Sequence, residues 1–208
     1  MTGPKEKKER ALGERLHLKG TRCDSPKCAA VRRPYPPGVH GKSRRRALSD
    51  FGRQLKEKQK FKLTYLIDER NLSRIFGEAE KASNKSGRGV GSKFLELLER
   101  RLDNAVFRMG LSASRLMARQ MVLHGHIFVN GRRTKSPGFV VKMGDVVSVR
   151  KESAADYNFR EIKEKMKTYD LPKWLALDAE KLEGRVMALP TDIEMPFEIS
   201  LLVEAFSK

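Results

Sequence analysis

LLERRLDNAVFRMGLSASRLMARQMVLHGHIFVNGRR, residues 97–133, passes from helical to strand-like periodicity without interruption. With the four residues before it, this stretch predicts an amphipathic helix over 93–109, because its apolar side chains recur every three or four positions. Gly110 suits the left-handed end of that helix, and Ser112 suits the N-cap of a second, shorter helix over 113–124. The stretch therefore predicts a helix-turn-helix.

The residues after the second helix predict a small antiparallel sheet. Gly125 is a helix stop, and 126–129 alternates toward Asn130-Gly131, the strongest two-residue hairpin signal. Arg132 and Arg133 then begin the return strand. Turn signals at Ser-Pro-Gly and Gly-Asp separate two further expected strands, Phe139–Val141 and Val146–Val149. The whole unit spans 93–150.

His124 and His126 raise the question of a metal site or an acid–base pair. One ends a helix and the other opens a strand, no third ligand follows at a recognisable spacing, and no nearby carboxylate orients either ring. We therefore predict no catalytic residue and no metal ligand here. Instead we expect an electropositive face, with Arg115 and Arg119 directed to solvent, that binds structured RNA by shape. Its candidate residues are Arg101, Arg115, Arg119, Gln120, His124, His126, Asn130, Arg132, Arg133 and Lys135.

Charge is distributed unevenly along the 208 residues, whose net charge is +18. Residues 1–62 hold 19 Lys and Arg against 6 Asp and Glu, and 63–150 hold 16 against 8. Residues 151–208 hold 9 against 12, so the excess lies in the first three quarters. This polarisation indicates a polyanionic partner. The N-terminus lacks an apolar signal region, and no long apolar run occurs, so we expect a cytoplasmic protein that does not bind a membrane. We also expect that it does not form a homo-oligomer.

Residues 1–48 are expected to form an extended basic arm. The segment RRPYPPGVHGKSRRR, residues 32–46, is rich in arginine and proline and has almost nothing apolar to bury. Proline favours extended polyproline conformations, so we expect the arm to be disordered when free and ordered by RNA. Its candidate RNA-binding residues are Arg32, Arg33, Tyr35, His40, Lys42, Arg44, Arg45 and Arg46.

Residues 49–92 are expected to form a helical domain that 151–208 completes. Ser49 and Asp50 are N-cap types before a first helix, in which Arg53 and Lys56 are further RNA-binding candidates. A second helix begins near Asp68, and the glycine- and serine-rich SNKSGRGVGS loop at 83–92 lacks the lysine spacing of a phosphate-binding loop. In the last segment we expect a helix at 154–169, a short strand at 186–189 and a helix at 198–206.

Residues 97–145 resemble the S4-type RNA-binding domain, in the segments LLERRLDNAVFRMGLSASRLMARQMVLHGHIFVNGRR and SPGFVVKMGD. KGTRCDSPKCAAVRRPYPPGVHGKSRRR, SDFGRQLKEKQK and EISLLVEAFSK resemble other parts of the bacterial uS4 ribosomal protein family. The resemblance implies an α+β protein in which a basic extended arm and a helical domain carry an inserted RNA-binding domain of helix-turn-helix plus small antiparallel sheet.

The same resemblance implies a function and a set of partners. Members are primary binders of small-subunit ribosomal RNA that nucleate assembly of the subunit body. They contact ribosomal protein five of the small subunit, lie near the messenger entry path and contribute to translational accuracy. These properties are expectations for the present chain.

The arm departs from the family in its cysteines. Some bacterial members bind zinc through a Cys-x-x-Cys pair followed by a Cys-x4-Cys pair. Only the second pair is present, as Cys23 and Cys28, and Glu6 and Glu9 align with the first. Because structural zinc sites are mostly closed sets of four thiolate and imidazole ligands, we expect no zinc and no other cofactor. Cys23 and Cys28 would be ligands only in a residual site, with His17 as a possible third.

The main alternative is an RNA-modifying enzyme of the pseudouridine synthase type that carries the same module. RRLDNA resembles the sequence around the catalytic aspartate of that family, which would make Asp103 catalytic. However, Asp103 lies inside the predicted helix, and residues 151–208 are too few for a catalytic domain. A third alternative, an accessory binder of the tRNA or heat-shock type, would not need the arm. We therefore predict a protein that is not an enzyme.

Overall fold

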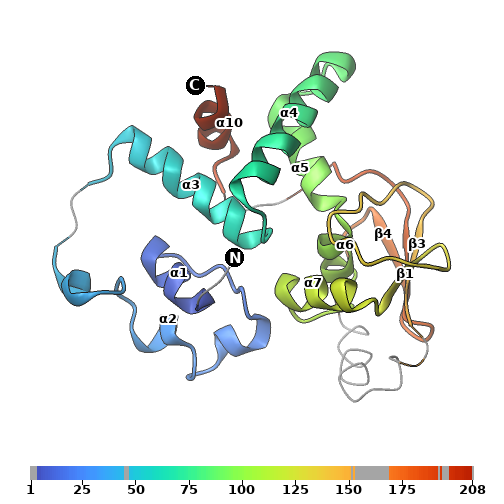
Figure 1. Ribbon diagram of the computed structural model, residues 1–208, viewed down its shortest axis with the longest axis horizontal. Coiled ribbons are helices and arrows are strands. Elements are labelled where there is room, and N and C mark those ends of the chain that lie inside the picture. Colours follow the sequence, from blue (N-terminus) through green and yellow to red (C-terminus); the bar gives the residue numbers. More distant parts are fainter. Residues whose placement is uncertain are drawn as a thin grey trace. The chain divides into compact units, whose positions relative to one another are not determined.

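The structure, a computed structural model, describes residues 4–44, 47–150, 152, 169–191, 193 and 197–207. The chain forms two compact units (Figure 1). The first unit comprises Met1–Phe94 and Glu194–Lys208, and the second comprises Leu95–Ile193.

Helices build the described part of the first unit. They are α1 (Lys5–Leu12), η1 (Gly20–Asp24), α2 (Ala29–Arg32), η2 (Val39–Lys42), α3 (Asp50–Thr64), α4 (Glu69–Ser86), the first half of α5 (Val90–Glu99), and α10 (Ile199–Ser207). Ser49 caps α3 as predicted, since its side chain accepts a hydrogen bond from the Gly52 backbone. Asp68 does the same for α4 through Asn71. Such caps satisfy N–H groups that the first turn leaves without partners.

Aromatic side chains form the centre of this unit. The Phe61 ring lies 6.1 Å from Phe94 and 4.9 Å from Phe197. Phe76 of α4 stacks on Phe206 of α10, with ring centres 4.6 Å apart. The helices α3 to α5 and the C-terminal helix thus share one core, and α10 packs along α3.

The N-terminal segment is more structured than the predicted extended arm. Residues 4–44 contain two short α-helices and two 3-10 turns, and α1 packs on α2. Leu18, Cys23 and Cys28 are buried there, together with Glu6 and Glu9. The sequence pattern missed this arrangement because two of its buried side chains are charged. The proline-rich part, 34–38, has no helix or strand, as expected.

In the second unit, helices pack against an antiparallel sheet. Its elements are the end of α5, α6 (Leu102–Arg108), α7 (Arg115–His124), β1 (Ile127–Val129), β2 (Arg132–Arg133), β3 (Val146–Val149), β4 (Leu175–Asp178) and β5 (Glu183–Val186). The strand order is β2-β1-β3-β5-β4, and all the pairs are antiparallel. Leu102, Met109, Val122, Ile127 and Val147 lie in the shared core. Gly184 of β5 allows the Met109 side chain to pack against the strand backbone, where a Cβ would collide with its sulfur. The predicted α+β class is confirmed.

The helix predicted over 93–109 is broken in two, because a distant loop binds its middle. α5 ends at Glu99 and α6 begins at Leu102. The Leu102 N–H donates to the Phe139 carbonyl at 2.8 Å, and the Val141 N–H donates to the Arg100 carbonyl at 2.8 Å. These bonds replace helical ones, so the residues expected to form a strand at 139–141 make only an isolated bridge, Arg101 to Val140.

Local signals at the turns were more reliable than those for distant pairing. The Asn130-Gly131 hairpin is confirmed, with φ angles of 50° and 74° in the left-handed region. Ser114, and not Ser112, is the N-cap of α7. The strand expected at 186–189 lies earlier, at β5, and pairs with β3 and β4.

Residues 151–208 therefore do not all complete the helical domain, since 175–186 extend the sheet of the second unit. The reason is nonlocal: β5 hydrogen-bonds to the edge of β3, which lies more than thirty residues earlier in the chain. The helix expected at 154–169 falls almost entirely outside the described residues.

Candidate nucleic-acid interface

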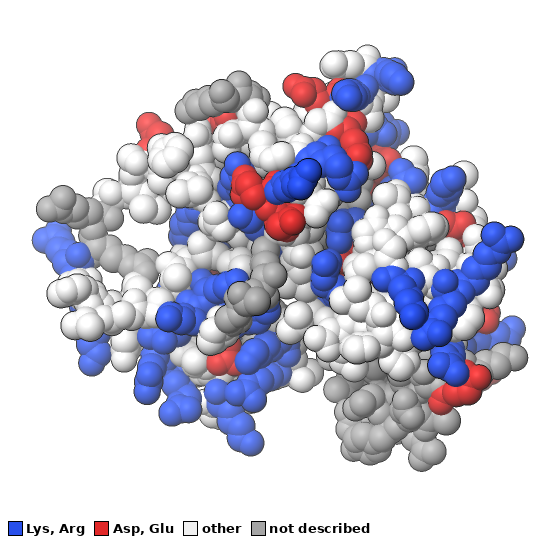
Figure 2. Space-filling model, in the orientation of Figure 1, with Lys and Arg blue, Asp and Glu red and all other residues white. Residues whose placement is uncertain are grey.

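Cationic side chains gather over two parts of the chain. Figure 2 shows Lys and Arg crowded over the N-terminal helices and again over the hairpin side of the second unit. The view shows few Asp and Glu side chains beside them. These two regions contain most of the residues that the sequence predicted to bind RNA, and their geometry differs.

Glu99 is the first anchor of the arginines in the second unit. Its side chain is 1% exposed and accepts hydrogen bonds from Arg108, Nε at 2.8 Å and Nη2 at 3.0 Å. Asn104 also donates to it at 2.8 Å. A carboxylate this deeply buried requires such partners, since an unpaired charge in the interior is strongly disfavoured. Glu99 therefore fixes the position of Arg108.

Asp103 is the second anchor. Arg101 binds it with two hydrogen bonds of 3.1 and 2.8 Å, the fork geometry that makes arginine–carboxylate pairs strong. Arg119 of α7 also donates to Asp103 at 3.1 Å, to the Oδ2 atom that accepts from Arg101 Nη2. Asp103 thus joins the start of α6 to the middle of α7.

Asn104 connects the two anchors. Its backbone N–H donates to the Asp103 side chain at 3.0 Å, and its side-chain NH₂ donates to Glu99. Its side-chain oxygen, Oδ1, accepts from Arg115 at 2.7 Å. The Arg115 guanidinium also lies over the Phe107 ring, 4.5 Å from its centre. We define Glu99, Asp103 and Asn104, with Arg101, Arg108, Arg115 and Arg119, as the arginine network.

Two expectations about these arginines are wrong. Arg101 is 7% exposed and fully engaged by Asp103, so it supports the fold from inside and is not available at the surface. Arg115 and Arg119 are not simply directed to solvent: their side chains are 18% and 34% exposed. The α7 periodicity alone did not reveal that α6 supplies carboxylate and amide partners. Each of the two side chains therefore keeps an exposed part while hydrogen bonds from its guanidinium fix its position.

The hairpin residues divide into structural and accessible ones. Asn130 donates to Asp145 at 2.8 Å and accepts from the Val146 N–H, so it holds β1 against β3. Arg133 donates to the carbonyls of His124 and Gly125, both at 3.1 Å, and thereby caps the C-terminal end of α7. Arg132 and Lys135 are exposed beside them.

His124 and His126 lie near each other, with ring centres 6.2 Å apart and planes tilted by 52°. His124 is exposed and His126 is partly buried. In the part of the chain that the structure describes, no three His, Cys, Asp or Glu side chains come together in a way that holds a metal ion. RNA binding by the two histidines stays a prediction.

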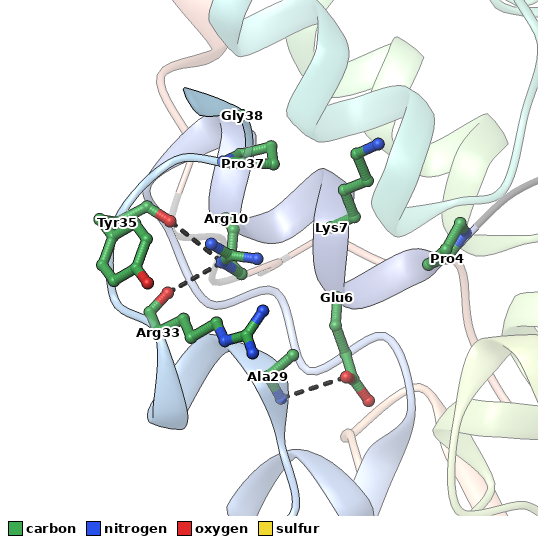
Figure 3. A pocket seen from close by; sticks show the side chains of 9 residues that line it. All are labelled: Pro4, Glu6, Lys7, Arg10, Ala29, Arg33, Tyr35, Pro37 and Gly38. Atoms are coloured by element: carbon green, nitrogen blue, oxygen red, sulfur yellow. Dashed lines mark hydrogen bonds between the residues drawn. The ribbon is translucent and has the colours of Figure 1, made fainter. Parts of the chain in front are cut away.

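In the N-terminal segment, Tyr35 is the centre of the candidate site. Arg10 and Lys42 lie over its ring, 5.2 and 5.4 Å from the centre. Arg10 also donates to the carbonyls of Arg33 and Tyr35, at 2.8 and 3.0 Å, and so fixes the irregular backbone after α2 (Figure 3). An open pocket of about 380 Å³ lies here, bordered by Lys7, Arg10, Arg33 and Tyr35 among others.

The other predicted residues of the first unit are distributed over several elements. Arg32, Arg33, His40, Lys42, Arg44 and Arg53 are exposed. Arg53 pairs with Asp50 at 2.8 Å, and Lys56 is partly buried against Glu14 at 2.8 Å. Arg45 and Arg46 lie outside the described residues.

Arg10 and Arg108 belong to these sites, although the sequence analysis did not select them. Arg108 has a detectable signal, since it follows Asn104 by one helical turn and thus shares a face with it. Arg10 has none, because its partners are backbone carbonyls more than twenty residues away.

Comparison with known proteins identifies the family. Residues 1–99 match the ribosomal protein S4/S9 N-terminal domain, and residues 100–147 match the S4 domain. The chain belongs to the uS4 family of ribosomal proteins. The small ribosomal subunit protein uS4 of Halothermothrix orenii is 49% identical over 96% of this chain and 94% of its own length. That of Caldicellulosiruptor bescii is 49% identical over 99% and 98%, and that of Thermus thermophilus is 46% identical over 96% and 94%.

The boundary between the two family matches divides the arginine network. Arg101, Asp103, Arg115, Arg119 and the hairpin all fall within the S4-domain match, while Glu99 lies just before it. Among the described residues, no helix combines the length and apolar character needed to cross a lipid bilayer.

Proposed function

We propose that this protein is a structural component of the small ribosomal subunit and binds small-subunit ribosomal RNA directly. The observation that carries this proposal is the arginine network, in which buried carboxylates hold partly exposed guanidiniums on one side of an S4 domain. Fixed cations suit recognition of RNA by shape, where phosphate and sugar contacts dominate. The relatives' names, small ribosomal subunit protein uS4, support the same function.

The RNA-binding surface has two parts in this proposal. In the second unit it includes Arg108, Arg115, Arg119, Gln120, His124, His126, Arg132 and Lys135. In the first unit it includes Arg32, Arg33, Tyr35, His40, Lys42, Arg44 and Arg53, with Lys56 at its edge. The charge excess of residues 1–150 supports both parts, because counterion release makes polyanion binding favourable.

The finer biological role rests on family resemblance. We propose that the protein binds early in assembly and nucleates the body of the subunit, and that it contributes to translational accuracy. Its further partners would be ribosomal protein five of the small subunit and messenger RNA at the entry path. Its location would be the ribosome in the cytoplasm.

We propose no catalytic activity. The enzyme alternative depends on Asp103 as a nucleophile or base, yet both of its oxygens accept hydrogen bonds from arginine and the side chain is 5% exposed. A carboxylate enclosed in this way has no access to a nucleotide. The geometry therefore favours a structural role for Asp103.

Co-sedimentation tests the proposed function. The tagged protein should sediment with small subunits after washing in high salt, at about one copy per subunit. In reconstitution, it should bind naked small-subunit ribosomal RNA without other proteins. Failure to bind naked RNA, with retention in complete subunits, would contradict direct RNA binding.

A further inference from the structure

Two buried glutamates hold the N-terminal segment together. Glu6 and Glu9 lie on the same face of α1 and are 8% and 2% exposed, although most of the surrounding charges are positive. Buried carboxylates are uncommon and need partners. The partners of these two reach the three segments that follow α1.

Glu6 joins α1 to η1 and to α2. One carboxylate oxygen accepts from Lys19 and from Arg22, both at 3.2 Å. The other oxygen accepts from the Ala29 N–H at 3.1 Å, at the first residue of α2 (Figure 3). Two cations and one backbone amide therefore converge on a single side chain.

Glu9 fixes the turn between α1 and η1. One of its oxygens accepts from the Leu16 and Leu18 N–H groups, both at 3.1 Å. His17, between them, has a φ of 50°, a left-handed conformation that non-glycine residues adopt at some cost. Glu9 thus stabilises a turn that the local sequence disfavours.

Cys23 and Cys28 are buried next to these glutamates, at 2% and 1% exposure, and neither forms a disulfide. The Cys23 sulfur accepts a hydrogen bond from the Lys19 N–H at 3.3 Å. The carbonyl of the same residue accepts from Arg15 at 2.7 Å. Both thiols fill space in the small core of this segment.

These residues do not fit the zinc site implied by family resemblance. A structural zinc site needs four converging donors, and here the Glu6 oxygens already face an ammonium, a guanidinium and an amide. Positive groups at 3.2 Å from a carboxylate exclude a metal cation from the same place. Throughout 4–44, all of which the structure describes, no three potential ligands come together around a metal position.

We propose that Glu6 and Glu9 replace a metal cross-link, so that the N-terminal segment of this protein folds and binds RNA without zinc. The carboxylates connect the same pieces of chain that a four-thiolate site would connect, through hydrogen bonds and ion pairs. The segment is then independent of metal supply and of the redox state of its thiols.

Metal content and spectroscopy provide the first test, on the full-length protein purified without chelator. We expect less than about one tenth of a zinc per chain, and no thiolate-to-metal absorption when Co²⁺ is added. A chelator should leave both thermal unfolding and RNA binding unchanged. Stoichiometric zinc that is lost in Cys23→Ser, together with RNA affinity, would overturn the proposal.

Matched substitutions provide the second test, with limited proteolysis of the N-terminal segment as the readout. Glu6→Gln turns an amide N–H₂ toward Lys19 and Arg22 or toward Ala29, so cleavage should be about tenfold faster. Cys23→Ala with Cys28→Ala should change the cleavage rate about threefold or less, since only packing and one weak hydrogen bond to sulfur are lost. The reverse order, with the cysteine variant the more sensitive, would contradict the proposal.

A gain of zinc binding is the third test. Glu6→Cys with Glu9→Cys supplies four thiols while removing the carboxylates. This variant should take up about one Zn²⁺ per chain and show Co²⁺–thiolate absorption, and its N-terminal segment should become protease-sensitive only with chelator. Failure to bind either metal would show that the glutamates do not occupy donor positions. Metal uptake and protease sensitivity are measured without RNA, so these two readouts distinguish this proposal from the proposed function.

Discussion

The two cationic regions use their carboxylates differently. In the second unit, Glu99 and Asp103 hold the guanidiniums themselves, so that the arginines enter a complex already oriented. In residues 4–44, the carboxylates pair with other cations: Glu6 with Lys19 and Arg22. Asp24 pairs with Arg15 and His17, and Glu14 pairs with Lys56 and Lys60 of α3. None of these pairs involves Arg32, Arg33 or Arg44.

From this difference we predict two modes of RNA binding on one chain. Arginines fixed by carboxylates lose little side-chain entropy on binding and favour one RNA shape. The arm arginines keep their freedom, and adapt to phosphates at a larger entropic cost. Substitutions should therefore change stability in one region and only affinity in the other.

The largest effect is expected for Asp103→Ala. It leaves Arg101 buried without its carboxylate, and removing one partner of a buried pair typically costs about 3–5 kcal/mol. Urea denaturation followed by circular dichroism measures this loss. Asp50→Ala is the matched control, because it removes an exposed aspartate–arginine pair and should cost about 1 kcal/mol or less. Equal losses in the two variants would show that the network does not stabilise the fold.

The arm should show the opposite behaviour. Arg32→Ala, Arg33→Ala and Arg44→Ala together should leave the unfolding free energy within about 0.5 kcal/mol, because these side chains are exposed. Affinity for small-subunit ribosomal RNA should fall, and the slope of log K against log salt should decrease in magnitude by about 2. Lys81→Ala with Lys85→Ala, exposed on α4, controls for loss of charge alone. An equal decrease of the slope in both variants would remove the distinction between the arm and ordinary surface cations.

Arg132 and Arg133 allow a structural arginine and an exposed arginine to be compared within one hairpin. Arg133→Ala removes two hydrogen bonds from the end of α7 and should destabilise the protein by about 1–2 kcal/mol. Arg132→Ala should weaken RNA binding without a measurable change of stability. Thermal unfolding and RNA binding of the two single variants check this division, and a stable Arg133→Ala protein would contradict it.

Sequence reasoning succeeded where the determinants are local. The Asn130-Gly131 turn and the Ser49 cap are properties of a few neighbouring residues. The break between α5 and α6 depends instead on the backbone of 137–141, which lies almost forty residues away. Pairing of β5 with β3 is nonlocal in the same way.

The same distinction applies to the candidate site. Charge and family resemblance predict which arginines bind RNA, and Arg32, Arg44 and Arg132 are exposed, as such contacts require. Burial of Arg101 was missed because a charged residue in an amphipathic pattern is expected at the surface. Its partner, Asp103, is only two residues away, but the helix boundary that brings them together is set by the distant loop.

The smallest effect concerns the pH dependence of the first unit. Burial raises the pKa of Glu14, but hydrogen bonds from Lys56 and Lys60 outweigh it and leave the pKa below its ordinary value of 4.5. The contribution of Glu14 is therefore complete above pH 4.5 and is lost as the pH falls through the lower folded-state pKa.

The variant Glu14→Gln checks this assignment. It should be less stable than the natural chain at pH 7, and the difference should shrink as the pH falls below 4.5. Because Glu14 is 36% exposed, solvent screening keeps the difference small. Thermal unfolding at pH 7 and at pH 3.5 measures it. A stability difference that grows in acid would mean that folding raises the pKa of Glu14, which contradicts this assignment.

The salt dependence of binding to purified small-subunit ribosomal RNA tests the central claim most directly. Six phosphate contacts shared by the two regions would give a slope of log K against log salt of about −4 to −5. We predict a slope of this steepness for the natural chain, reduced in the arm triple variant while its unfolding free energy stays the same. An affinity that stays constant between low and moderate salt would contradict the account.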